Sequence, residues 1–197
     1  VNYTMSERWP VSGYDTNRGG WQRVSYNDGR PSAGVISTNG FYYRYLSADS
    51  NFNRGRANAI SRILLCDNYL ARTVDFPQDI DLTDQEGIDN AIRENAACAG
   101  CHATLDPLAS YISGFGLLDD ATEYEPDLEN EWEETTGQAP AYLGKSGEDI
   151  GDLGRQIIED PRFARCAAQR VYEGMMGRPA TLEDQQAIGR HTAAFVD

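Results

Sequence analysis

Apolar side chains recur at helical spacing through most of the chain beyond its first quarter. Over residues 54–72 they fall three and four positions apart, which predicts an amphipathic helix. A capping box of Thr83 and Glu86 predicts the start of a second helix. The pair Asp106-Pro107 predicts the end of that helix. Further helices are expected over residues 107–113, 146–159 and 161–176, and beyond Thr181 around His191.

Residues 1–53 lack this periodicity and are rich in Gly, Ser, Asn, Tyr and Trp. The β-prone runs 35–38 and 41–43 predict short strands between loops. Such a segment makes a poor core of its own, so we expect it to pack on a neighbour. We therefore divide the chain into a loop-rich N-terminal segment, 1–53, which would end a preceding domain, and a mainly α-helical domain, 54–197.

Composition narrows the range of partners. The 197 residues carry a formal net charge of -14, which argues against nucleic acid and anionic lipid because both attract basic surfaces. Such acidity favours solubility, or the electrostatic steering of a basic redox partner. No run of eighteen apolar residues occurs, so no transmembrane segment is expected. The chain opens with Val1 and not with Met, which we interpret as a processed or partial chain.

Residues 98–102 read CAGCH, a CxxCH motif and a specific signal for covalent attachment of haem c. The thiols of Cys98 and Cys101 can add across the two vinyl groups of haem, and the imidazole of His102 then lies beneath the iron. On a helix these three residues share one face. We expect a backbone carbonyl near Pro107 to accept a hydrogen bond from Nδ1 of His102 and to fix its tautomer.

Three residues are candidates for the sixth iron ligand. Met175 and Met176 differ by about 100° on a helix, so only one of them can face the iron, and His191 is the third candidate. Methionine ligation would raise the reduction potential relative to two histidines, whereas an open sixth position would permit peroxide or oxygen chemistry. A zinc site would instead need two further ligands from Cys66, Cys166 or His191, whose spacing fits no standard finger.

Two cysteines, Cys66 and Cys166, remain once the motif has taken two of the four. An even remainder in an exported protein predicts a disulfide between them, and two separate buried thiols are the alternative. The cysteines and the haem motif together predict a periplasmic or extracellular location.

The stretch 119–134 is rich in carboxylates and holds no basic residue. A solvated acidic loop is the plain interpretation, and a calcium site or a docking patch are the alternatives. The spacing matches no EF-hand loop, because the central glycine and the alternating aspartates are missing.

Several of these motifs resemble the planctomycete-type cytochrome-associated multidomain proteins, which are large exported proteins with CxxCH-containing C-terminal domains of unknown function. The motif followed by residues 105–108, LDPL, is similar to their CxxCHxxxDPxG signature, with alanine in place of the glycine. Residues 53–57 and 63–66 resemble their RG…ILxxLLC segment, and residues 160–166 followed by 177–178 resemble their DPRFxxC…GR segment. The resemblance implies a C-terminal fragment or subunit that binds haem and transfers electrons.

The sequence thus predicts a cytochrome c-like helical domain around one covalently bound haem c. It would act as a monohaem electron carrier outside the cytoplasm, as a subunit of or fragment from a larger assembly. Its redox partner would be another cytochrome or a larger complex. The alternatives are a haem enzyme, peroxidase or oxygenase, with an open distal site, and a zinc-binding or structural interaction module.

Overall fold

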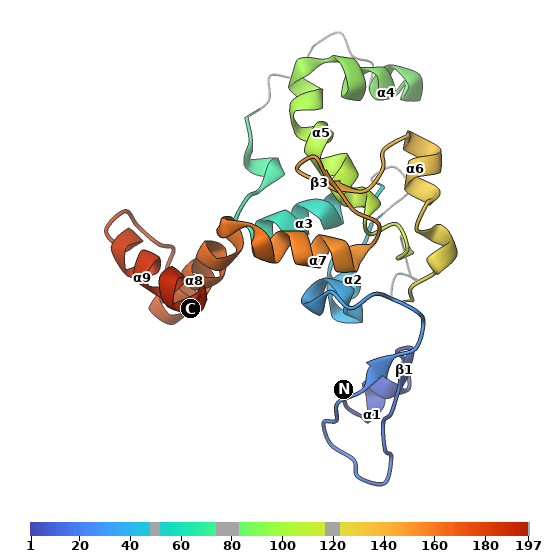
Figure 1. The fold of residues 1–197 in the computed structure, drawn as a ribbon, viewed down its shortest axis with the longest axis vertical. Coiled ribbons are helices and arrows are strands. Elements are labelled where there is room, and N and C mark those ends of the chain that lie inside the picture. The colour runs from blue at the N-terminus through green and yellow to red at the C-terminus, as the bar shows by residue number, and fades with distance from the viewer. Residues whose placement is uncertain (48–51, 74–82, 117–122, 197) are drawn as a thin grey trace.

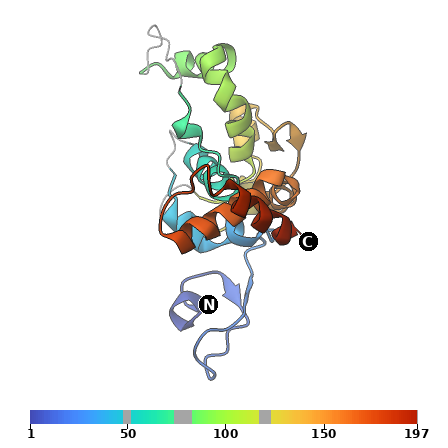
Figure 2. The ribbon, with the colours of Figure 1, turned by 90° about the vertical axis from the view of Figure 1, so that its left-hand side faces the viewer.

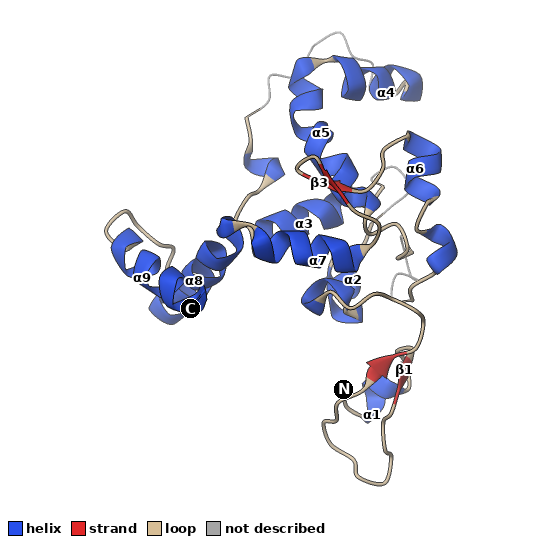
Figure 3. Ribbon diagram, in the orientation of Figure 1, coloured by secondary structure: helices blue, strands red, loops and turns tan. Residues whose placement is uncertain are grey.

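The computed structural model describes residues 1–47, 52–73, 83–116 and 123–196 of the chain. The described residues are mainly helical (Figures 1 and 3), which confirms the predicted class. Their α-helices are α1 (Tyr3–Ser6), α2 (Asn39–Arg44), α3 (Arg54–Leu64), α4 (Gln85–Glu94), α5 (Ala96–Ser110), α6 (Glu131–Thr136), α7 (Ile150–Glu159), α8 (Pro161–Met176) and α9 (Gln185–Val196). Shorter 3-10 helices are η1 (Gly34–Ser37), η2 (Tyr69–Ala71) and η3 (Pro126–Leu128).

Two short antiparallel strand pairs complete the fold. β1 (Val11–Ser12) pairs with β2 (Ser25–Tyr26) near the N-terminus, where it forms a small unit with α1. Both views show this unit at one end of the molecule, apart from the helical body (Figures 1 and 2). β3 (Ala141–Tyr142) pairs with β4 (Lys145–Ser146), and β3 packs against α5.

The runs 35–38 and 41–43 form helical turns, so the prediction of strands there was wrong. They belong to η1 and α2, and they bury Ile36, Phe41 and Tyr42. These side chains join the same core as α3, α5 and α7, and this burial outweighs their β-propensity. The division of the chain at residue 53 stays a prediction, although the core extends across it.

A stack of two aromatic rings marks the centre of the core. Tyr42 and Phe115 are fully buried, and their ring centroids lie 3.6 Å apart. The guanidinium of Arg56 is equally buried beside them and donates to the carbonyls of Phe115 at 3.1 Å and Tyr45 at 2.8 Å. Burial lowers the pKa of Arg56 to about 10, so it remains charged at neutral pH. Its bonds to these carbonyls compensate for the cost of burying that charge.

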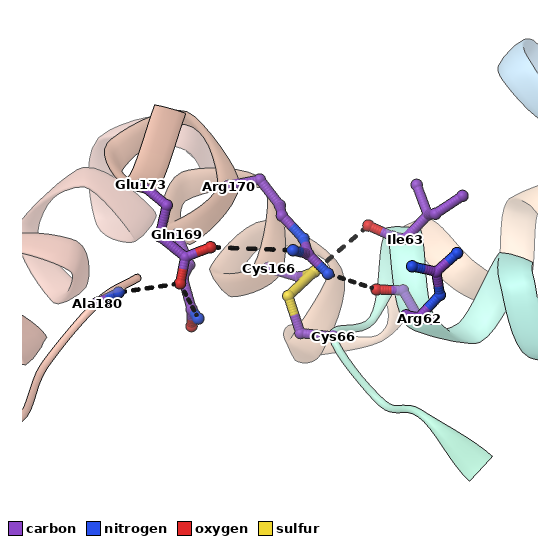
Figure 4. The surroundings of a disulfide bond; sticks show 8 residues. All are labelled: Arg62, Ile63, Cys66, Cys166, Gln169, Arg170, Glu173 and Ala180. Carbon is purple, nitrogen blue, oxygen red and sulfur yellow. Dashed lines mark hydrogen bonds and ion pairs between the residues drawn. A yellow bond between two sulfur atoms is a disulfide. The ribbon is translucent and has the colours of Figure 1, made fainter. Parts of the chain in front are cut away.

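The disulfide expected between Cys66 and Cys166 joins the turn just after α3 to α8 (Figure 4). Their Cα atoms lie 5.4 Å apart across a sequence separation of 100. α3 ends at Leu64, before the predicted end at residue 72. Cys66 adopts a left-handed backbone with φ of 55°, a conformation that ends a helix. Nearby, Arg170 donates to the carbonyl of Arg62 at 3.0 Å and so adds a second link between α3 and α8.

The C-terminal helices lie where their end signals predict them. The carboxylate of Asp149 accepts from the backbone of Asp152 at the start of α7, and that of Asp160 accepts from Arg162 at the start of α8. Gly177 ends α8 in the left-handed conformation, with φ of 64°. α9 then folds back and packs along α8.

Removal of the disulfide should lower stability, because the bond limits the freedom of the unfolded chain. We expect the double variant Cys66→Ser, Cys166→Ala to lose about 5 kcal/mol in free energy of unfolding, as the chain-entropy relation gives for a loop of this length. Chemical denaturation followed by circular dichroism measures the loss. An unchanged denaturation midpoint, with the disulfide verified in the parent protein, would contradict this expectation.

Asp160 should make stability depend on pH. Its carboxylate accepts from Arg162 and, at 2.6 Å, from the hydroxyl of Tyr142. The side-chain hydrogen bond from Arg162 is the main cause that lowers the pKa of Asp160 to about 2. A carboxylate with a pKa depressed in the folded state stabilises the fold above its unfolded pKa of about 4, and this stabilisation disappears as the pH falls from about 4 to 2.

The variant Asp160→Asn isolates this contribution. Between pH 5 and pH 2 the parent protein should lose about 2 kcal/mol more stability than the variant, since only the parent has this carboxylate to protonate. Urea denaturation at a series of pH values measures both curves. Parallel curves for parent and variant would show that the carboxylate is not coupled to folding.

Candidate haem-attachment site

The CxxCH motif lies in the first turns of α5, which is a separate helix from α4. Asn95 interrupts the single helix predicted across this region, with an extended backbone and a side chain that accepts from Ala97 N at 2.9 Å. Asparagine is a favoured N-cap because its side-chain oxygen satisfies an otherwise unpaired N–H group. α5 therefore begins at Ala96 and places Cys98 within its first turn.

α5 continues through Pro107 to Ser110, so the predicted stop at Asp106-Pro107 was wrong. Proline inside a helix loses one backbone hydrogen bond. The neighbouring side chains offset this loss, because Leu105, Asp106, Leu108 and Ala109 are buried on the core side. The continued helix keeps Asp106 one turn beyond His102 and on the same face.

The two thiols and the imidazole of the motif share one stretch of α5. Cys98 and Cys101 are free and half-buried, and His102 is also half-buried. The side chain of Arg72, which follows η2, lies beside that of Cys101. One turn later, the hydroxyl of Thr104 lies 2.9 Å from that of Tyr69, which is in η2. The η2 segment thus borders the motif.

The buried carboxylate of Asp106 fixes the orientation of His102. Its Oδ1 atom lies 3.0 Å from Nδ1 of His102, and the carboxylate is 4% exposed. Burial by itself would raise the pKa of Asp106, but the hydrogen bonds from Arg54 and His102 bring it below its ordinary value. An ionised carboxylate can only accept hydrogen bonds, so Nδ1 of His102 donates. In the neutral imidazole, Nε2 then carries the free lone pair and can ligate a metal.

Arg54, at the first position of α3, holds the other side of this carboxylate. Its Nε donates to Oδ1 of Asp106 at 2.7 Å and its Nη2 donates to Oδ2 at 2.9 Å. The guanidinium also lies over the ring of Trp132 in α6, 5.4 Å from the ring centroid. A bidentate arginine–carboxylate pair fixes the orientation of the carboxylate more strictly than a single hydrogen bond does. The carboxylate therefore cannot rotate away from His102 without breaking contacts to α3.

Sequence reasoning missed both Asp106 and Arg54 as parts of the site. The prediction that a backbone carbonyl near Pro107 accepts from Nδ1 of His102 was wrong. The side chain of Asp106 makes that contact. The spacing of His102 and Asp106, four residues apart, was the available signal. Pro107 obscures this signal, because a proline at that position predicts the end of the helix before Asp106 can share a face with His102. Arg54 comes from another helix, and no local pattern links it to the motif.

Haem c fits this group of side chains. Covalent attachment needs two reduced thiols and a neighbouring imidazole with a free Nε2, and residues 98–102 supply all three on one helix. The carboxylate behind Nδ1 is the kind of outer partner that metal-ligating histidines usually have.

The distal candidates lie elsewhere in the fold. Met175 and Met176 are exposed at the end of α8, and His191 is exposed on α9. In both views α8 and α9 lie away from α4 and the start of α5 (Figures 1 and 2). Met175 and His191 instead line a shallow apolar groove between α8 and α9. The structure thus does not bring these three residues to His102, and the sixth ligand stays a prediction.

The disulfide weakens the zinc interpretation. Cys66 and Cys166 are bonded to each other, so His191 alone remains of the three proposed additional ligands. Across residues 1–47, 52–73, 83–116 and 123–196, no group of three or more His, Cys, Asp or Glu side chains is arranged to hold a metal ion.

The structure describes residues 123–134 of the acidic stretch. Its first residues lie outside the described part of the chain, while the rest forms η3 and α6. Trp132 is buried on one side of α6, and Glu131, Glu133 and Glu134 are exposed on the other. This part of the predicted acidic loop is therefore a short amphipathic helix with a solvated acidic face.

In the part that the structure describes, no helix has both the length and the apolar character needed to cross a membrane. No family model, no curated protein and no solved structure matches the chain. The functional argument therefore depends on the chemistry of the site.

Proposed function

We propose that this chain is a monohaem c-type cytochrome that transfers electrons outside the cytoplasm. The observation that carries the proposal is the CxxCH motif in one continuous helix, with the Asp106 carboxylate bonded to Nδ1 of His102. This contact leaves Nε2 as the ligating nitrogen of the imidazole. The Cys66–Cys166 disulfide supports an oxidising compartment, which is also where haem c would be attached.

Three residues would hold the haem. Cys98 and Cys101 would each add an S–H bond across a vinyl group, so that two thioether bonds form and both thiol hydrogens end on the porphyrin side chains. His102 would ligate the iron through Nε2. When bound, haem supplies a one-electron couple between ferric and ferrous iron.

The acidity of the chain supports a positively charged redox partner, another cytochrome or a larger complex. The formal net charge is -14, and opposite charges accelerate the encounter of two proteins and orient them. We propose that the chain acts as a subunit of, or a fragment from, a larger assembly.

Two cysteine pairs give a matched test of covalent attachment. Protein exported together with the haem-attachment machinery should gain the mass of one haem and a c-type pyridine haemochrome spectrum. The variant Cys98→Ala, Cys101→Ala should lose all covalent haem, because no thiol remains to form a thioether. The control variant Cys66→Ser, Cys166→Ala should keep one haem despite its lower stability. Colourless parent protein, or a motif that holds zinc, would contradict the proposal.

A haem enzyme, peroxidase or oxygenase, is the second candidate. One observation favours it: Met175, Met176 and His191 lie on α8 and α9, away from the start of α5 (Figures 1 and 2). An iron that lacks a protein ligand on its distal side could bind peroxide or oxygen there. The two candidates share the proximal side and differ in coordination number.

The electronic spectrum separates these candidates. If one of the three residues ligates the iron, the ferric protein should be low-spin, and only one variant of Met175→Leu, Met176→Leu and His191→Ala should convert it to high-spin. If the distal side is open, the parent should be high-spin and should bind cyanide and, when reduced, carbon monoxide. A low-spin spectrum unchanged by all three substitutions would exclude these ligands.

A further inference from the structure

One carboxylate lies between a cation and the imidazole of the motif. Oδ1 of Asp106 contacts Nδ1 of His102 at 3.0 Å and Nε of Arg54 at 2.7 Å, so the two donors share a single oxygen. Oδ2 takes a second bond from Arg54 at 2.9 Å. Asp106 is 4% exposed and Arg54 is 19% exposed at the side chain. Water therefore has little access to weaken these contacts.

We propose that Asp106 sets how strongly His102 donates electrons to the iron, and that Arg54 limits this effect. Both are positioning residues, because neither would touch the haem iron. The inference rests on the proposed function, since it takes His102 as the iron ligand.

The physical basis is a competition for negative charge. A carboxylate that accepts from Nδ1 draws the proton toward itself, so the imidazole gains negative charge and becomes a stronger ligand. A stronger ligand stabilises ferric iron more than ferrous iron. Arg54 draws negative charge from the same carboxylate oxygen. The hydrogen bond between that oxygen and the Nδ1 proton is therefore weaker. The two side chains should therefore act on the iron in opposite directions.

Another arginine–aspartate pair, Arg72 and Asp67, serves as a control. Arg72 donates to Asp67 at 2.9 Å, and the side chain of Arg72 lies beside that of Cys101. Asp67 also pairs with Arg162 at 3.4 Å. This pair lies close to the motif and carries the same charges, but its carboxylate bonds arginines and not the imidazole. The variant Asp67→Asn therefore removes a nearby negative charge without changing the Nδ1 contact.

The test uses exported, haem-loaded protein and three variants, Asp106→Asn, Arg54→Gln and Asp67→Asn. One measurement is the midpoint potential, and the other is the proton NMR shift of Nδ1–H of His102 in the diamagnetic ferrous state, with carbon monoxide added if the iron is five-coordinate. Asp106→Asn should favour ferrous iron and so raise the midpoint potential, by ~59 mV for each tenfold change in the ratio of ferrous to ferric iron. Its Nδ1 proton should move upfield.

Arg54→Gln should move both readouts the opposite way, and Asp67→Asn should leave the Nδ1 proton in place. The inference is overturned if Asp106→Asn leaves that proton unmoved, if Arg54→Gln shifts it upfield, or if Asp67→Asn reproduces the Asp106→Asn shift. Should Asp106→Asn fail to fold, the direction of the Arg54→Gln shift decides alone. Parent protein without covalent haem would overturn the proposed function together with this inference, whereas unmoved readouts in haem-loaded protein overturn this inference only.

Discussion

The ionised carboxylate of Asp106 is the contact on which the arrangement around the motif depends. It is buried, so it needs charged or hydrogen-bonding partners to offset the loss of water. Those partners come from two helices, His102 in α5 and Arg54 in α3. Removal of either partner would leave a buried charge poorly compensated, which is costly. The same requirement that ties the two helices together therefore also holds the imidazole in one orientation.

The first turn of α3 extends this role beyond the motif. Three side chains from the N-cap and first turn of α3 contact the segment in and just after α5. Asn53 donates to the carbonyl of Ile112 at 3.3 Å, Arg54 binds Asp106, and Arg56 donates to the carbonyl of Phe115. Backbone carbonyls without partners are costly in a protein interior. The polar side chains of this turn thus allow the chain after α5 to pass through the core without regular secondary structure.

Local signals predicted the fold well where they act within one helix. Asp160 and Gly177 bound α8 as expected, since caps depend only on neighbouring backbone. The strands predicted around Phe41 failed because the choice between strand and helix there is made by burial against residues far along the chain. The motif itself was evident in the sequence. The pair of Arg54 and Asp106 was not, because a contact across 52 residues leaves no periodic trace.

The disulfide has a consequence for the integrity of the chain. Cys66 and Cys166 enclose α4, α5, the acidic stretch and α7 in one covalent ring. Proteolytic cleavage of any single peptide bond inside the ring opens it without separating the pieces. A nicked molecule would therefore keep its mass, apart from one added water, until a reductant breaks the sulfur–sulfur bond. The segment that carries the motif would stay tethered to the core through its own half of the chain.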